Sequence, residues 1–208
     1  SIPLSIREFR RSAPSVPAHH IEQSVTKGEV VIELKDVSAN YNDDGEIFAL
    51  KSVSLSIRAG EIVALMGRNG AGKSTLLGAM VGQSPLTSGS VKVGGKDPAT
   101  LAGKELISTI GFVPQEPADL LYARTIEEEC SFSDRDGGVL AGSTWRIYSE
   151  LMENPDGKAH PRDISEGQRL GLVLSIILAA SPAIVLLDEP TRGLDYEAKK
   201  RSEEHTSE

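Results

Sequence analysis

The sequence predicts an α/β protein with a parallel sheet flanked by helices, on three observations. Two short apolar runs, residues 61–66 and 183–187, have the length and composition of buried parallel strands. Helical periodicity follows the first run and precedes the second. A long helical section lies between them. Strand, helix, helical insert, helix and strand in this order are typical of an α/β layout, and 208 residues suffice to bury a core.

The N-terminal part is expected to hold a linker and two strands. Residues 1–28 combine a short amphipathic piece with a Pro/Ser-rich stretch, which we interpret as a linker from a preceding domain. From Val30 the pattern becomes strand-like, with strands predicted over residues 30–34 and 50–57. Asn, Asp and Gly at residues 42–45 mark a turn between them.

The remaining elements follow from helical spacing and from breakers. Apolar residues recur at helical spacing after Lys73. Residues from about 116 to 165 form the predicted helical insert, broken at 134–138 and 154–157. A helix over residues 167–180 ends before Pro182, because proline cannot continue it.

Composition limits the partners. The 22 Lys+Arg against 30 Asp+Glu give a formal charge of -8, which counts against a nucleic-acid protein because phosphate neutralisation supplies most non-specific affinity. The single cysteine, Cys130, is interpreted as an apolar filler. The longest apolar stretch, residues 170–180, is shorter than the ~20 residues that cross a bilayer, and no signal-peptide pattern is visible. Any membrane role is therefore expected through a partner.

Residues 67–75 read Gly-Arg-Asn-Gly-Ala-Gly-Lys-Ser-Thr, a pattern that predicts a phosphate-binding loop. Its glycines let backbone N–H groups turn toward an anion, and a helix starting near Gly72 adds partial positive charge. Lys73 is expected to reach the β and γ phosphates, Ser74 to offer a hydroxyl to Mg²⁺, and Thr75 to lie near the α phosphate. The alternative is a structural turn. The predicted nucleotide-binding residues of the loop are Gly67, Asn69, Gly70, Gly72, Lys73, Ser74 and Thr75.

Asp188 and Glu189 follow the second apolar run directly. Adjacent carboxylates at a strand end point to different sides, so Asp188 can hold Mg²⁺ through its water while Glu189 orients or deprotonates an attacking water. The alternative is a solvated acidic turn before Pro190. Five apolar residues before Asp188 favour burial, and a buried carboxylate needs a partner.

Residues 164–168, Ile-Ser-Glu-Gly-Gln, resemble the signature motif of ATP-binding cassette (ABC) proteins. Other matches to that family are Gly193-Leu194-Asp195, which resembles its D-loop, Gln115, which matches its Q-loop glutamine, and Tyr41, at the place of an adenine-stacking aromatic. The resemblance covers about residues 29–200. It implies a P-loop NTPase core, an N-terminal antiparallel β subdomain and an inserted α-helical subdomain.

The resemblance also implies activity, cofactors and partners. Such domains are ATPases that use ATP and Mg²⁺, and two of them sandwich two ATP molecules. The signature group, defined here as Ser165, Gly167 and Gln168, would then face the γ-phosphate held by a partner cassette. Glu189 and Gln115 would be catalytic, Ser74, Gln115 and Asp188 would hold the metal, and Asp195 would belong to the D-loop. The chain departs from the family pattern at Ile164 and at Glu166, which places an acidic group near the expected phosphate face.

Residues 113–129 and 191–196 resemble the ATPases of energy-coupling-factor transporters, which import vitamins, cobalt or nickel. The resemblance implies a transmembrane partner subunit and a position on the cytoplasmic face of the cell membrane, and the N-terminal linker suggests the second cassette of a tandem fusion. The alternatives are another transporter type, an ABC protein outside transport, or a cassette that binds ATP mainly to hold an assembly together.

Residues 201–208 resemble a translated sequencing adapter, so we expect a non-native tail. We also expect the switch histidine of the family to be missing, with His205 no substitute for it, and little turnover by the chain on its own.

Two further features of the helical insert have structural interpretations. Trp145 is interpreted as core of the helical insert. Residues 127–129, three glutamates, are interpreted as a solvated helix face.

Overall fold

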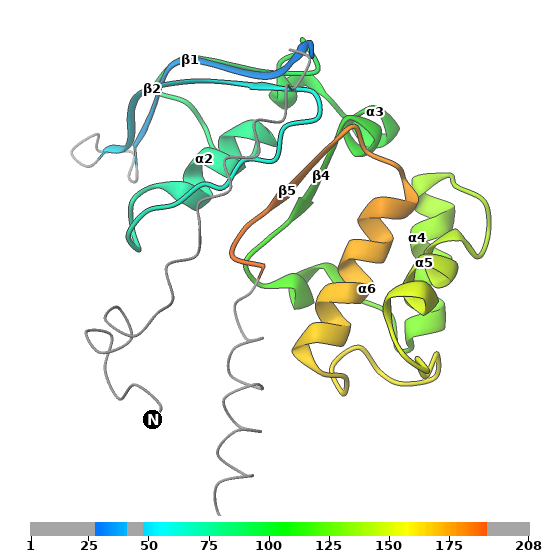
Figure 1. Ribbon diagram of the computed structural model, residues 1–208. Coiled ribbons are helices and arrows are strands. Elements are labelled where there is room, and N and C mark those ends of the chain that lie inside the picture. The colour runs from blue at the N-terminus through cyan, green and yellow to red at the C-terminus, as the bar shows by residue number, and fades with distance from the viewer. Residues whose placement is uncertain (1–27, 41–47, 191–208) are drawn as a thin grey trace, which may run out of the picture.

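The computed structural model describes residues 28–40 and 48–190, and it shows an α/β arrangement of two sheets and a helical group (Figure 1). In chain order the elements are β1 (Val30–Asn40), β2 (Phe48–Arg58), α2 (Lys73–Met80), β3 (Ser88–Val93), the 3₁₀ turn η1 (Pro98–Thr100), α3 (Gly103–Thr109), β4 (Ile110–Val113), the 3₁₀ turn η2 (Pro117–Leu120), α4 (Ile126–Gly137), α5 (Ser143–Leu151), α6 (Glu166–Ala179) and β5 (Ile184–Leu187). Residues 1–27 of the predicted linker, the turn at 42–45, Tyr41, Asp195 and the C-terminal tail lie outside the described residues.

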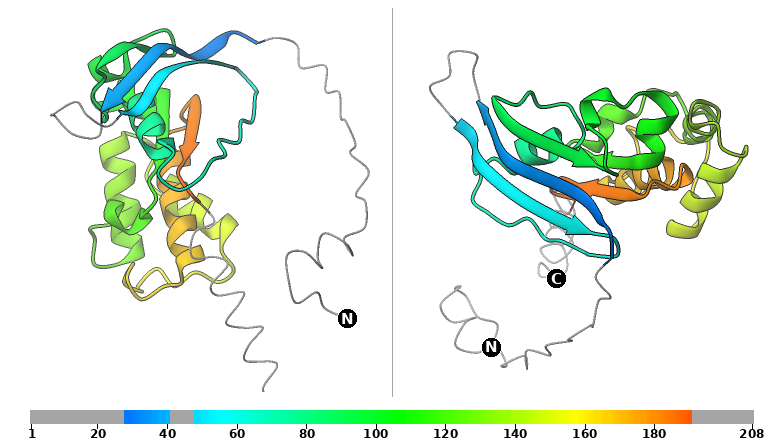
Figure 2. Two further views of the ribbon diagram at one scale, coloured as in Figure 1. Left: turned by 90° about the vertical axis from the view of Figure 1, so that its left-hand side faces the viewer. Right: turned by 90° about the horizontal axis from the view of Figure 1, so that it is seen from above.

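Three antiparallel strands form the first sheet, in the order β2-β1-β3. Figure 2 shows β1 and β2 side by side along this layer. Leu34 of β1 is the register partner of Leu55 on one side and of Val91 on the other. The two predicted strands are therefore confirmed. The first is longer than predicted, because Val37 and Ala39 are also buried and extend the ladder.

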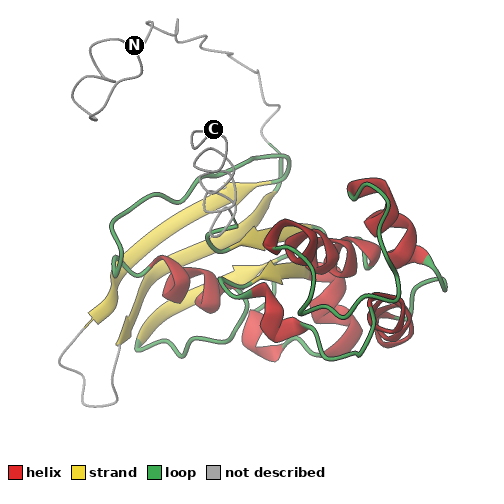
Figure 3. Cartoon of the chain, turned by 90° about the horizontal axis from the view of Figure 1, so that it is seen from below, coloured by secondary structure: helices red, strands yellow, loops and turns green. Residues whose placement is uncertain are grey.

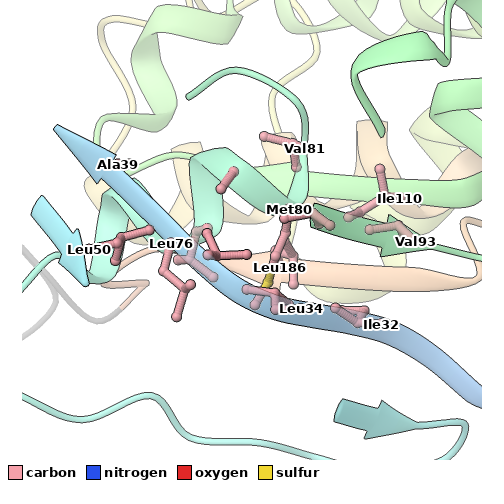
Figure 4. Close-up of a cluster of buried hydrophobic side chains, with 14 residues drawn as sticks. Ile32, Leu34, Ala39, Leu50, Leu76, Met80, Val81, Val93, Ile110 and Leu186 are labelled. Carbon is pink, nitrogen blue, oxygen red and sulfur yellow. The ribbon is translucent and has the colours of Figure 1, made fainter. Parts of the chain in front are cut away.

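A single core cluster joins the two sheets through α2. Leu76 and Met80 of α2 belong to one buried cluster with Leu34 of β1 and with Ile110 and Leu186 of β4 and β5 (Figure 4). Each buried aliphatic side chain contributes about 1.5–3 kcal/mol relative to an exposed one. The helical spacing after Lys73 thus predicted the element and its buried face correctly, and this packing fixes the helix that follows the glycine loop.

The second sheet is parallel, with β4 paired to β5 from Ile110↔Ile184 to Val113↔Leu187. On the side away from α2, the helices α4, α5 and α6 form a separate group, which Figure 3 shows gathered at one end of the molecule. Their core contains Ile126, Cys130, Tyr148 and Leu172, with Trp145 packed against it. The helical insert and the core position of Trp145 are confirmed. No helix within the described residues is both long and apolar enough to cross a membrane.

The predicted break at residues 134–138 is wrong in its start, because α4 continues to Gly137. Asp134 lies inside the helix, where its carboxylate accepts hydrogen bonds from the backbone N–H groups of Gly142 (2.6 Å) and Thr144 (3.0 Å). The side chain therefore supports the helix by binding the next loop. The helix ends at Gly137, and the next residue, Gly138, is its C-cap with a left-handed φ of 65°.

The prediction of a strand over residues 61–66 is wrong. This run has no regular structure, and Ile62 and Met66 are almost fully exposed, while Val63 and Leu65 line a groove of about 360 Å³ with residues of β2, α2 and β5. An apolar run becomes a buried strand only when it pairs with a neighbouring strand, and residues 61–66 pair with none of the described strands. Among the described residues β5 pairs with β4 alone, so its other edge stays open and the predicted burial of β5 is also only partial.

Candidate functional site

The glycine loop that is predicted to bind phosphate leads directly into α2, as expected. Gly72 is the N-cap residue with φ 87°, and Gly70 is also left-handed at 79°, whereas Gly67 is not. A Cβ at Gly72 would collide with the carbonyl oxygen of Ala49. Glycine is therefore required at this position for two reasons, a left-handed backbone and a close approach to β2.

Lys73 reaches back over its own loop. Its Nζ donates to the carbonyl oxygens of Gly67 (3.0 Å) and Arg68 (3.1 Å). These contacts hold the ammonium group over the loop, and an anion there would exchange them for stronger charge-assisted bonds. Asn69 and Ser74 are exposed and Thr75 is half-buried, so the predicted loop residues surround an accessible surface.

The ends of β4 and β5 bring together residues that are far apart in the sequence. Because Val113 pairs with Leu187, the next residues of both strands emerge at the same edge, and the Asp188 N–H donates to the Val113 carbonyl (2.9 Å). Beyond this point Gln115 Nε2 donates to Glu189 Oε2 (3.3 Å). Both residues were predicted separately, and the parallel register places them in contact.

The two carboxylates at this edge differ in environment. Asp188 is 5% exposed, which confirms that it ends a strand in a buried position and excludes the solvated turn. Glu189 is partly buried and has a φ of 48°, a left-handed conformation that is strained for a residue with a side chain. Such a strained backbone persists only where the surrounding structure fixes the residue in place. Here the hydrogen bond from Gln115 helps to fix Glu189.

The predicted metal ligands offer a fitting donor set. Ser74 supplies a hydroxyl, Asp188 a carboxylate, and Gln115 an amide oxygen that its bond to Glu189 leaves unused, because that bond is made by the nitrogen. Oxygen donors in small number suit Mg²⁺, which keeps several waters and phosphate ligands. No group of three or more His, Cys, Asp or Glu side chains in the described part of the chain could hold a metal by itself.

The signature group lies at the start of α6. Ser165 is the N-cap residue, its Oγ accepts from the Gln168 N–H (3.2 Å), and Gln168 Oε1 accepts from the Ser165 N–H (2.9 Å). This reciprocal capping box gives both residues a structural role in starting the helix. The Ser-x-x-Gln spacing carries that signal in the sequence, but the sequence reasoning assigned these residues only to phosphate binding.

The structure leaves the signature group apart from the phosphate loop. The helix α6 packs against α4, α5 and β4, whereas α2 packs against β2 and β3. Figure 1 shows the two helices on opposite sides of the β4–β5 pair. One chain therefore presents two separate candidate phosphate-facing groups instead of one closed site.

Sequence reasoning missed the role of Glu129. The interpretation of residues 127–129 as a solvated face holds for the exposed Glu127 and Glu128 but is wrong for Glu129, which is 6% exposed. Its carboxylate accepts from the N–H groups of Tyr122 (2.8 Å) and Ala123 (2.6 Å), shortly after Gln115. An acidic run gives no signal of which member turns inward, so only the packing of α4 reveals this contact.

Cys130 behaves as the apolar filler that was predicted. Burial, together with Asp134 and Glu129 nearby, raises the pKa of its thiol from 9.0 to about 12. Burial also raises the pKa of Tyr148, which packs in the same cluster. The thiol is 2% exposed and stays protonated near neutral pH, which disfavours a reactive cysteine because the accessible thiolate is the nucleophile.

Comparison with known proteins agrees with this geometry. A family model described as ABC transporter matches residues 50–192. A Streptomyces avermitilis protein, provisionally named an ABC transporter ATP-binding protein, is 55% identical over 157 residues, covering 76% of this chain and 28% of that protein. The chain thus spans less than a third of the length of this relative.

Solved structures show the same similarity. The dimeric structure of MJ0796, a bacterial ABC transporter cassette, is 30% identical with a TM-score of 0.69, covering 81% of this chain and 78% of that one. The structure of cbiO1 from Clostridium perfringens, part of the ABC transporter complex cbiONQ, is 25% identical with a TM-score of 0.63, covering 79% of this chain and 67% of that one.

Proposed function

The chain belongs to the ABC transporter ATP-binding family, and on that premise we propose that it binds ATP and hydrolyses it to drive a membrane transporter. The observation that supports hydrolysis most is the contact between Gln115 and Glu189 at the ends of two parallel strands. It joins an amide that can sense the nucleotide to a carboxylate that can activate water.

The loop residues would bind the triphosphate. Lys73 would leave the carbonyls of Gly67 and Arg68 for the β and γ phosphates, and the N–H groups at the start of α2 would donate to the same oxygens. Gly70, Gly72, Asn69 and Thr75 would line this cradle, and Tyr41 would stack on the adenine.

Hydrolysis would depend on residues at the strand ends. Ser74, Asp188 and the Gln115 amide oxygen would hold Mg²⁺, which neutralises the charge that develops on the phosphates. Glu189 would accept a proton from the attacking water, and Gln115 would orient its carboxylate through the bond already present. The strained backbone at Glu189 is consistent with a residue held for chemistry.

The arrangement of the two groups favours a composite site with a second cassette. Because α6 and α2 pack on different elements, the signature group is available to a nucleotide bound by another copy or another cassette. The dimeric MJ0796 structure supports this form of assembly. Asp195 would lie near that interface, as the D-loop resemblance implies.

The transporter type is proposed on narrower support. The resemblance of residues 113–129 to energy-coupling-factor ATPases, and the likeness to cbiO1 of the cbiONQ complex, favour an importer of vitamins, cobalt or nickel. A transmembrane subunit would contact the segment after Gln115, on the cytoplasmic face of the membrane. The hydrogen bonds from the Tyr122 and Ala123 N–H groups to the Glu129 carboxylate would keep this segment rigid enough to transmit motion.

Nucleotide binding tests the proposal in the chain itself. A fluorescent ATP analogue should bind in the presence of Mg²⁺, and Lys73→Ala should weaken binding at least about tenfold by removing a charge-assisted contact. Lys92→Ala, a change at an exposed lysine of β3, is the matched control and should bind normally. Equal affinities in the two variants would contradict the site.

Turnover tests the role of Glu189 separately. Glu189→Gln should retain ATP binding and lower phosphate release about 10²- to 10⁴-fold when the chain is assembled with a partner cassette. Unchanged turnover would exclude Glu189 as the base while leaving the nucleotide site intact.

A further inference from the structure

Arg169 organises the turn that leads into α6. Its Nε donates to the carbonyl of Pro161 (3.1 Å), and its Nη2 donates to the carbonyls of Arg162 and Ile164 (3.2 Å each). The side chain is only 13% exposed. One planar guanidinium thus holds three carbonyls of the same turn, which fixes the path of the chain into Ser165.

The same guanidinium pairs with Glu166. Nη1 of Arg169 donates to Oε1 of this carboxylate, one helical turn away. Glu166 is the first residue of α6, where the partial positive charge of the helix favours a carboxylate. An unpaired carboxylate there would repel a phosphate that approaches the same N–H groups. The ion pair cancels this charge and directs the carboxylate along the helix.

The Ser165 hydroxyl keeps its donor capacity. In the capping box its oxygen accepts a hydrogen bond, so its own proton is not used there. The hydroxyl and the free N–H groups at the start of α6 can therefore donate together to an anion, provided that Glu166 does not compete with that anion.

We propose that Arg169 is a positioning residue for the signature group: it neutralises Glu166 and fixes the turn so that Ser165 and Gly167 can donate to a phosphate held by a partner cassette. The inference rests on the composite site proposed above. In this proposal the negative charge of Glu166, the acidic residue that departs from the family pattern, is neutralised by its ion pair with Arg169. Glu166 then stabilises the helix start without adding net negative charge.

ATP-driven association of the full chain tests this role. In a Glu189→Gln background, which slows hydrolysis, light scattering with ATP and Mg²⁺ gives the chain concentration at half-association. Arg169→Met should raise this concentration about tenfold at low salt, because it leaves Glu166 unpaired beside the phosphate. Arg162→Met is the matched control, since that arginine lies in the same turn, is exposed and forms no side-chain hydrogen bond or ion pair within the described residues.

Two further measurements separate charge from structural support. Adding Glu166→Gln to Arg169→Met should restore much of the association, which also shows that the altered chain folds. Salt should reduce the defect of Arg169→Met, because screening weakens repulsion between charges but does not replace lost hydrogen bonds to the turn. If Arg169→Met only disrupted the structure of the turn, neither the added Glu166→Gln substitution nor salt would restore association.

Each outcome decides between the two proposals. If the Glu189→Gln chain does not associate with ATP, the composite site fails and the role of Arg169 fails with it. If it associates but Arg169→Met matches Arg162→Met, or if the double variant stays impaired at every salt concentration, the composite site stands and the role of Arg169 is overturned.

Discussion

Replacing Glu129 by alanine should destabilise the chain, because this buried carboxylate binds two backbone N–H groups. One bond reaches Ala123, which is itself buried, and the other reaches Tyr122. Hydrogen bonds to a charged group contribute about 1.5–3 kcal/mol each, and a buried donor left without a partner adds its desolvation cost. Since the Tyr122 bond is partly solvent-accessible, we expect a loss of about 3 kcal/mol in the free energy of unfolding.

Urea unfolding followed by circular dichroism measures this loss, and Glu128→Ala provides the matched control. Glu128 is the preceding residue of α4, is exposed, and makes one hydrogen bond to the Arg124 N–H at 3.2 Å. Water can replace that bond, so its removal should cost less than about 1 kcal/mol. The reasoning is refuted if the two variants unfold at the same urea concentration with equal slopes.

Two further predictions concern the glycine loop and the buried thiol. Gly72→Ala should lower the free energy of unfolding more than Gly95→Ala, because both glycines are left-handed but only the Cβ at Gly72 meets the Ala49 carbonyl; equal losses in urea unfolding would contradict this. Cys130 should make stability fall at high pH: its pKa is raised from 9.0 to about 12 by burial, so its contribution is complete below pH 9 and is lost as pH rises toward 12, by about 1.4 kcal/mol per pH unit. Unfolding curves of Cys130→Ala from pH 8 to 10.5 should lack this slope, and parallel behaviour of the two chains would count against it.

The errors of sequence interpretation have a common physical cause. Residues 61–66 have the composition of a buried strand, yet among the described residues they pair with no strand, although one edge of β5 is open. Composition alone does not determine whether an apolar run pairs. Glu129 shows the converse case, since a charged residue in an acidic run is buried because two backbone groups of a preceding loop meet it. Whether residues 61–66 form a strand and whether Glu129 is buried both depend on which groups pack against them, and the local sequence pattern does not identify those groups.

Local chemistry was sufficient for the elements that carry their own signals. The glycines before Lys73 start α2 as predicted, and the Ser-x-x-Gln spacing at Ser165 starts α6 through a capping box, because caps and helix periodicity involve neighbours within a few residues. The contact between Gln115 and Glu189 and the pairing of Arg169 with the turn before it arise only when strands align and helices pack. Sequence therefore named the residues of the candidate site, and tertiary structure determined which of them meet, because register and packing bring together groups as distant as Gln115 and Glu189, 74 positions apart.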